Sequence, residues 1–242
     1  MCSTCGCHDH SHTHGENLRL VKVEQDLLAK NDRHAAANRE WLAARGVTMI
    51  NLMASPGAGK TSLLVRTLRD LRDGMPFAVI EGDQQTRLDA DRIEACGVPA
   101  VQVNTGKGCH LDAHQVGHAL ADLDPPPGTV VWVENVGNLV CPAGFDLGET
   151  ARVVLLSVTE GDDKPLKYPP MFHSADLVVL TKTDLLPYVD FDVARCLDRA
   201  RRLRPGVPVL QASAKSGAGL EDWYRWLSAQ RQPARPAAQH GR

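Results

Sequence analysis

Short apolar runs alternate with amphipathic segments along most of the chain. The runs are rich in Val, Ile and Leu and fall at 47–53, 77–80, 98–103, 129–133, 153–158, 177–180 and 207–210. The segments between them have helical spacing of apolar residues at 61–72, 86–96, 111–123, 193–203 and 220–227. Uninterrupted apolar runs are typical of strands that are buried on both faces. The pattern predicts an α/β domain of three layers, with a mostly parallel sheet between two layers of helices.

Three further segments flank this domain. Residues 17–45 have helical spacing of apolar residues, and Gly46 is a typical helix stop. This predicts a long N-terminal helix, which either packs on the domain or offers a docking surface to a partner protein. Pro, Ala and Arg dominate the last twelve residues, which predicts a flexible C-terminal tail. We therefore expect a tail at 1–15, a helical segment at 16–46, the α/β domain at 47–230 and a second tail at 231–242.

Three cysteines and four histidines crowd the start of the chain. Cys2 and Cys5 have the C-x-x-C spacing of a thiolate clamp, and Cys7 adds a third sulfur. Histidines then alternate with other residues at positions 8, 10, 12 and 14. Such a segment buries no apolar surface, so we expect it to be flexible and to bind Ni²⁺ or Zn²⁺ through thiolates and imidazoles. A disordered tail that binds no metal is the alternative.

Composition and charge restrict the class of protein. With 242 residues and 43% hydrophobic content, the chain can bury a sizeable core. Its net charge of −2 does not show the excess of basic residues that is typical of nucleic-acid-binding proteins. We expect no membrane partner, since no apolar run is long enough to span a bilayer and no secretory pattern is present. Seven cysteines are an odd number, and three of them fall within the first seven residues, which favours a cytoplasmic protein with thiols for metal over a disulfide scaffold.

A glycine-rich loop follows the first apolar run and precedes a helical segment. It contains Gly57, Ala58, Gly59, Lys60, Thr61 and Ser62, which is the strand–loop–helix setting of a phosphate-binding P-loop. The glycines let backbone N–H groups approach phosphate oxygens, Lys60 reaches the β and γ phosphates, and the Thr61 hydroxyl holds Mg²⁺. Ala54 replaces the first glycine of the usual pattern. A glycine-rich turn without a ligand is the alternative.

Two carboxylates follow later apolar runs. Asp83 comes after 77–80 and Glu134 after 129–133. In parallel sheets the ligand lies at the carboxyl ends of the strands, so each carboxylate could hold Mg²⁺ or orient the attacking water. We therefore expect Lys60, Asp83 and Glu134 to form the catalytic set, with solvated loop carboxylates as the alternative.

Two short motifs indicate which base is bound. The segment 181–184, Thr-Lys-Thr-Asp, resembles the Asn-Lys-x-Asp guanine motif of GTPases, with Thr in place of Asn. Asp184 can accept hydrogen bonds from guanine N1–H and its exocyclic amine, a pair that adenine lacks, and Lys182 would lie along the base or ribose. Ser213, Ala214 and Lys215 resemble the motif that lies near guanine O6. Together these motifs favour GTP and GDP over ATP; the alternative role of Asp184 is a helix cap.

The motifs taken together resemble those of the nickel-insertion GTPases of hydrogenase maturation, the HypB family. The resemblance covers nearly the whole chain, and its cysteine-bearing blocks are the most specific. The matching blocks are the Cys2, Cys5 and Cys7 motif and residues 55–61, 81–83, 108–113, 134–143 and 163–169. Urease-maturation GTPases are the nearest family to exclude, because they usually lack the N-terminal cysteine motif.

The resemblance implies a second metal site. In the family, residues that match Cys109, His110 and Cys141 bind Zn²⁺ or Ni²⁺ at a dimer interface. Two thiolates and an imidazole on neighbouring strand-end loops can share one ion, although buried structural cysteines are the alternative. His114 and His118 are either auxiliary ligands or surface residues. Cys96 and Cys196 lie in helical patterns and are expected in the core.

The resemblance also implies a function. It predicts a GTP-hydrolysing metallochaperone that delivers Ni²⁺ to [NiFe]-hydrogenase and dimerises on GTP or metal binding. Its partners would be a second nickel-maturation accessory protein and the hydrogenase large subunit. We hypothesise that GTP orders the loop between Glu134 and Cys141, and that hydrolysis releases the nickel. Lys164 and Lys167 either contact nucleotide across the dimer or are solvated.

Three other functions remain open at this point. The histidine-rich start also suits a metal-storage protein whose nucleotide site is regulatory or idle. The chain could also be an ATPase or a kinase of related fold. The same machinery would also suit a GTPase chaperone for another metalloenzyme, such as urease or a cobalamin mutase.

Overall fold

The computed structural model describes residues 13–83, 88–106 and 108–232. The predicted metal-binding cysteines Cys2, Cys5 and Cys7 lie outside these residues, as does the end of the chain beyond 232. Within the described part, no helix is both long and apolar enough to span a bilayer.

The seven strands form one sheet in which every neighbouring pair is parallel, so the predicted α/β architecture is confirmed. The order across the sheet is β3-β2-β4-β1-β5-β6-β7. The strands are β1 (Thr48–Ala54), β2 (Phe77–Asp83), β3 (Ala100–Asn104), β4 (Val130–Glu134), β5 (Ala151–Ser157), β6 (Leu177–Thr181) and β7 (Val209–Gln211). Because all strands run in the same direction, their carboxyl ends meet at one edge, where ligands bind in such sheets.

The helices cover both faces of this sheet. They are α1 (Thr13–Arg45), α2 (Lys60–Leu71), α3 (Leu88–Glu94), α4 (Ala113–Leu123), α5 (Lys164–Lys167), α6 (Pro169–Ser174), α7 (Val193–Leu203) and α8 (Leu220–Gln230), with 3-10 turns η1 (Cys141–Gly144) and η2 (Thr183–Tyr188). On one face, α2, α3 and α8 pack over the strands. On the other face, α1 and α4 cover one half of the sheet, and α6 and α7 cover the other half.

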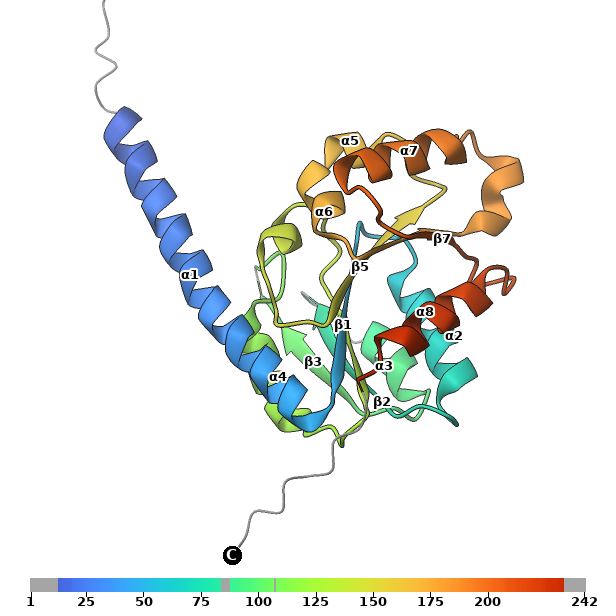
Figure 1. Cartoon of the computed structure of the whole chain (residues 1–242), viewed down its shortest axis with the longest axis horizontal. Helices are drawn as coiled ribbons and strands as arrows, with labels where there is room; N and C mark the ends of the chain where they lie inside the picture. Colours follow the sequence, from blue (N-terminus) through green and yellow to red (C-terminus); the bar gives the residue numbers. More distant parts are fainter. Residues whose placement is uncertain (1–12, 84–87, 107, 233–242) are drawn as a thin grey trace, which may run out of the picture.

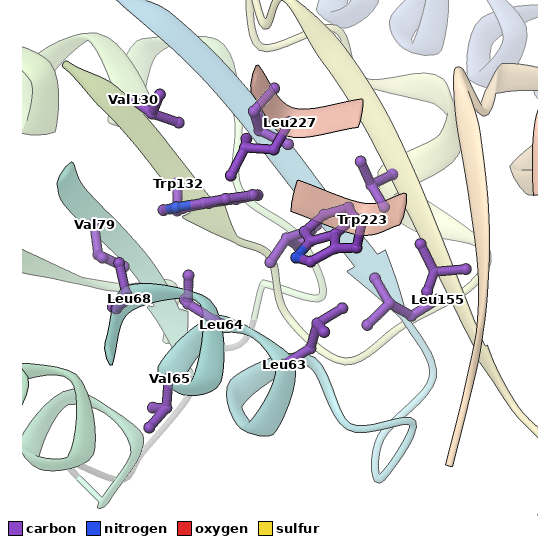
Figure 2. Close-up of a cluster of buried hydrophobic side chains, with 14 of the residues drawn as sticks. Leu63, Leu64, Val65, Leu68, Val79, Val130, Trp132, Leu155, Trp223 and Leu227 are labelled. Atoms are coloured by element: carbon purple, nitrogen blue, oxygen red, sulfur yellow. The ribbon is translucent and has the colours of Figure 1, made fainter. Parts of the chain in front are cut away.

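Alternate residues of each strand face opposite layers, as strand geometry requires. In β1, Ile50 and Leu52 pack under α2 and α8, whereas Met49 lies under α1 and α4. Figure 2 shows the first of these cores, in which Trp132 of β4 and Trp223 of α8 lie beside the leucines of α2. The Trp223 Nε1–H donates to the Thr67 hydroxyl at 2.8 Å, so its polar atom is satisfied inside the core.

The long helix α1 packs on the domain through its C-terminal half. Asn38 donates to the carbonyls of Ala113 and Leu147 at 2.7 and 2.9 Å, and Leu42 is buried in the core under α4. Figure 1 shows the other half of α1 running clear of the sheet. The first interpretation of this helix, packing on the domain, therefore holds for its C-terminal half. Its start at Thr13 makes residues 13–15 helical, although the sequence pattern assigns them to the tail.

Candidate nucleotide and metal sites

The loop between β1 and α2 has the backbone conformation that its glycines permit. Gly57 and Gly59 have φ of +76° and +97°, a region that residues with a Cβ adopt only under strain. Gly59 is the N-cap of α2, so Lys60, Thr61 and Ser62 form the first turn of that helix. The N–H groups at this helix end and the positive end of its dipole face the loop, which suits an anion such as a phosphate.

A cavity of about 480 Å³ lies over this loop. Its lining combines the loop, the end of β4 and residues beyond it: Pro56, Gly57, Gly59, Lys60, Thr61, Ser62, Arg92, Glu134, Val136, Gly137 and Lys182. The Thr61 hydroxyl donates to Glu134 Oε1 at 2.6 Å, and both side chains are largely buried. Hydroxyl and carboxylate oxygens at this spacing are ligands that Mg²⁺ prefers, so the residues present fit that ion.

The other predicted carboxylate, Asp83, is the last residue of β2. Glu134 pairs with Glu81 in the register of β2 and β4, so the Asp83 backbone lies at the same sheet edge, beyond the end of β4. Its side chain is not among the described ones. The Mg²⁺ and catalytic roles of Asp83 therefore remain predictions from sequence.

Arg92 is a lining residue that the sequence analysis missed. It lies in the last turn of α3, and it reaches the phosphate cavity from the helix that follows β2. The only sequence signal is a basic residue on the helix after the strand that carries Asp83. No motif singles it out, because its approach to the cavity depends on how α3 packs against the sheet.

A second cavity, of about 320 Å³, adjoins the first and is more apolar in its lining. It collects both guanine motifs, and its lining is Gly59, Ser62, Leu63, Thr181, Lys182, Asp184, Leu185, Ala212, Ser213, Ala214 and Lys215. The fully buried Ser213 hydroxyl donates to Asp184 Oδ1 at 2.6 Å and accepts from the Ser216 N–H at 3.0 Å. The carboxylate of Asp184 is thereby held at the cavity, which suits recognition of a base edge better than helix capping.

The base cavity is tied directly to the phosphate loop. The Lys182 ammonium donates to the Gly57 carbonyl at 2.7 Å, from a backbone with φ of +58°. The Thr181 hydroxyl donates to the Ala58 carbonyl at 2.6 Å. Thr181, which stands where the guanine motif has Asn, therefore connects the two loops with its hydroxyl.

The structure brings together the three residues of the predicted second metal site. Cys109 and His110 lie between β3 and α4, and Cys141 begins the turn η1 after β4. One ligand atom from each of the three lies within 4.8 Å of the others, and all three residues are partly buried. Within the described part of the chain, no other three Cys, His, Asp or Glu residues are grouped this way. Two sulfurs and an imidazole suit Zn²⁺ or Ni²⁺.

The protonation of this cluster follows from its packing. A hydrogen bond with the neighbouring Cys141 thiol, then burial, and then charge repulsion between the two sulfurs raise the pKa of Cys109. Burial lowers the pKa of His110, whose ring lies 3.9 Å from that of Phe145 between centroids. The imidazole is therefore held in its neutral form, which can bind metal, whereas the thiols must first release protons.

Other candidate residues lie apart from this cluster. His114 and His118 contact each other on α4, with 3.2 Å between their Nε2 atoms, and the His114 ring lies beside His34 of α1. Cys96 is buried in the core, as is Cys196, and burial raises the pKa of Cys196 to about 12. Both are core thiols, as the sequence pattern predicts.

The two loop lysines make local ion pairs. Lys164 lies 3.2 Å from Glu160, and Lys167 lies 2.7 Å from Asp163. Glu160 also accepts from the Ser55 hydroxyl at the start of the phosphate loop, so Lys164 is connected to that loop through one residue. A contact of either lysine with nucleotide across a dimer stays a prediction.

Comparison with known proteins gives consistent matches. The family described as CobW/HypB/UreG, nucleotide-binding domain, matches residues 48–211. The hydrogenase maturation factor HypB of Azotobacter vinelandii is 61% identical over 213 residues, which cover 88% of this chain and 70% of that protein. That of Escherichia coli K12 is 53% identical over 93% of this chain and 78% of its own length. The crystal structure of Helicobacter pylori HypB in complex with nickel has a TM-score of 0.77 at 40% identity, covering 86% of this chain and 99% of that one.

Proposed function

The chain belongs to the HypB hydrogenase maturation factors of the CobW/HypB/UreG family, and on that premise we propose that GTP binding and hydrolysis control its delivery of nickel. The observation that carries this proposal is the segment from Glu134 to Cys141. It begins at a carboxylate bonded to the phosphate-loop Thr61 and ends at a thiol of the metal cluster. Six residues thus separate a nucleotide-site residue from a metal ligand, so a movement at one end can reach the other.

The hydrolysis is phosphoryl transfer to water, in which the protein mainly positions groups and stabilises charge. Lys60 and the N–H groups at the start of α2 would bind the β and γ phosphates. Thr61, with Asp83 and Glu134, would hold Mg²⁺, which neutralises charge on the phosphates when bound. Glu134 would in addition orient the attacking water, and Arg92, which also lines the cavity, would add positive charge there.

Base selection belongs to the second cavity. Asp184 would accept from guanine N1–H and the exocyclic amine, with its orientation fixed by Ser213. Lys182 would lie along the base or ribose, and Ala214 and Lys215 would face guanine O6. GDP would occupy the same site after hydrolysis, because these contacts are made to the base and ribose, which hydrolysis leaves unchanged.

Nickel is the cargo in this proposal, and Cys109, His110 and Cys141 hold it. Three ligands from one chain leave a position for a water, a bridging group or a ligand of the acceptor. Zn²⁺ fits the same donors. The exposed Val140 beside Cys141 is consistent with a homodimer that forms over this cluster on GTP or metal binding. The N-terminal cysteines would supply a further Ni²⁺ or Zn²⁺ site.

The setting follows from this role. Free thiols at a delivery site require a reducing compartment, so we place the protein in the cytoplasm. A second nickel-maturation accessory protein would exchange metal with it, and the hydrogenase large subunit would receive the nickel. The N-terminal half of α1, which runs clear of the domain, is available for such a contact.

Loss of either Lys60 or Cys109 tests the proposal in cells. We expect Lys60→Ala and Cys109→Ser to abolish hydrogenase activity at low nickel, and excess nickel in the medium to restore part of it. Hydrogenase activity that is unchanged in both variants would contradict the delivery role. Binding of many nickel ions per chain in a stoichiometric titration would instead indicate storage.

A further inference from the structure

The loop between β4 and η1 contacts the phosphate loop at its midpoint. Gly137 lines the phosphate cavity together with Lys60 and Thr61. A Cβ added at Gly137 would lie 3.1–3.2 Å from atoms of Pro56, so the two backbones approach as closely as a glycine allows. A phosphate group in this cavity would therefore lie beside the loop backbone at residue 137.

Two asparagines of the same loop hold the segment that carries two metal ligands. Asn135 Oδ1 accepts from the Leu111 N–H at 3.2 Å, and Asn138 Nδ2 donates to the Cys109 carbonyl at 3.3 Å. These two backbone groups lie on either side of His110. The side chains of the loop thus bind the Cys109–Leu111 segment at both ends, although the partners are 24 and 29 positions apart in the sequence.

The two asparagines differ in how firmly they are fixed. Asn135 is 2% exposed, its Nδ2 donates to Asn51 Oδ1 of β1 at 3.3 Å, and its Oδ1 also accepts from the Val136 N–H. Asn138 is only partly buried, and its Oδ1 accepts from the Val140 N–H at 2.8 Å, next to Cys141. Asn135 is therefore anchored to the sheet, whereas the less buried Asn138 directly follows Gly137, with the buried Leu139 after it.

We propose that Asn138 is the positioning residue that carries the nucleotide state to the metal cluster. When the loop moves at Gly137, the Asn138 side-chain N–H moves the Cys109 carbonyl to which it is bonded. The Asn138 Oδ1, which accepts from the Val140 N–H, moves the turn before Cys141 together with the loop. Asn135 serves as the fixed end of the link. This inference rests on the proposed control of nickel delivery by GTP, and it assigns that control to one side chain.

The test compares nickel affinity in two nucleotide states. The full chain is titrated with Ni²⁺ in GDP and in a non-hydrolysable GTP analogue. It carries Cys2→Ser, Cys5→Ser and Cys7→Ser, so that the signal of thiolate binding to nickel comes from Cys109 and Cys141. Binding is followed by thiolate-to-nickel charge-transfer absorption. Asn138→Asp keeps the acceptor for Val140 and removes the donor to Cys109, and Asn138→Ala removes both without adding charge. Asn104→Ala is the matched control, because that asparagine accepts from the Gly106 N–H within the segment between β3 and α4 itself.

The ratio of the two nickel affinities is the decisive quantity. We expect the parent and Asn104→Ala to bind Ni²⁺ roughly 5- to 150-fold more tightly with the GTP analogue, the usual range for coupled sites. Both Asn138 variants should still bind Ni²⁺ and nucleotide, with a ratio within about twofold of one. Asn138 variants that keep the parent ratio would overturn the inference and leave the proposed function intact. A parent ratio of one would instead overturn the nucleotide control itself.

Discussion

The base site and the metal cluster lie at the same edge of the sheet, on opposite sides of β1, but different forces hold them. At the ends of β6 and β7, Asp184 is fixed by the buried Ser213 hydroxyl, and Lys182 is bonded to the phosphate loop. At the ends of β3 and β4, the two thiols and the imidazole lie against one another, with 3.5 Å between Cys109 Sγ and His110 Nδ1.

Because of this difference, the base site is suited to selecting its ligand, and the metal cluster is suited to a change in affinity. Hydrogen bonds that exist before the ligand arrives make the base site selective, since little reorganisation is needed on binding. The metal cluster must release protons and settle around an ion, so its affinity depends on pH and on the position of its loops. A protein that selects one nucleotide and holds a metal only temporarily needs both kinds of site.

The largest expected effect is on the metal cluster. Cys109→Ser removes one of two thiolates, so Ni²⁺ affinity should fall by more than the roughly 10- to 100-fold that loss of an outer-sphere partner costs. GTP affinity should stay within about twofold of the parent. Nickel titration by charge-transfer absorption measures this in the chain whose Cys2, Cys5 and Cys7 are replaced by Ser, with Cys96→Ser, in the core, as the matched control. Retained nickel affinity in Cys109→Ser would remove this cluster as the metal site.

A change at Asp184 should affect the base site almost as strongly. Asp184→Asn loses an acceptor for the guanine edge, and GTP affinity should fall roughly 100-fold, or about 3 kcal/mol. Affinity for XTP should rise, because an amide can donate to the xanthine O2 and accept from N1–H. Competition binding with both nucleotides measures this, and Asp190→Asn, at an exposed position, is the control. Unchanged preference for GTP would contradict the assigned base contact.

The two sites should also differ in their response to pH. The pKa of Cys109 is raised, so protons compete with metal there, and Ni²⁺ affinity should increase between pH 6 and 8 by up to about tenfold per unit. Burial lowers the pKa of His110, so protons compete less with metal at its imidazole than at an exposed histidine. GTP affinity should be nearly constant over the same interval. A nickel affinity as flat as that for GTP would contradict the proposed thiolate ligands.

The smallest effect concerns the support of Asp184. Ser213→Ala removes the hydroxyl that fixes this carboxylate, at a cost of about 1.5 kcal/mol, or roughly tenfold in GTP affinity. Ni²⁺ affinity should not change. Isothermal titration with GDP measures the loss, and Ser228→Ala, on the exposed face of α8, is the comparison. Equal GDP affinity in both variants would mean that Asp184 is oriented by other contacts.

Much of the fold was predictable because its strands are apolar on both faces. Runs such as 129–133 can be satisfied only inside a sheet covered by two layers, and parallel strands then bring the residues after each run to one edge. The structure places the phosphate loop, Glu134, Asp184 and the three residues of the metal cluster at this edge, as that rule predicts. Local patterns such as Gly57 to Ser62 also identify their own backbone conformation.

The remaining features depend on tertiary register and leave no local pattern. Arg92 reaches the phosphate cavity only because of the way α3 packs. Asn135 and Asn138 find backbone partners on a segment that precedes them by more than twenty residues. Asn38 likewise anchors α1 through buried contacts with α4 and the Leu147 carbonyl. In the sequence alone, an asparagine with such buried partners cannot be told from a surface asparagine. Its partners become apparent only when the strands have their places in the sheet.

The central claim is that the nucleotide state sets the affinity of the metal cluster, and one equilibrium measures it. The chain carrying its native Cys109, His110 and Cys141 is titrated with Ni²⁺ in GDP and in a non-hydrolysable GTP analogue, with the N-terminal cysteines replaced. The account predicts tighter binding with the GTP analogue and, by thermodynamic linkage, an equal tightening of the analogue by Ni²⁺. Equal nickel affinities in the two nucleotide states would contradict it.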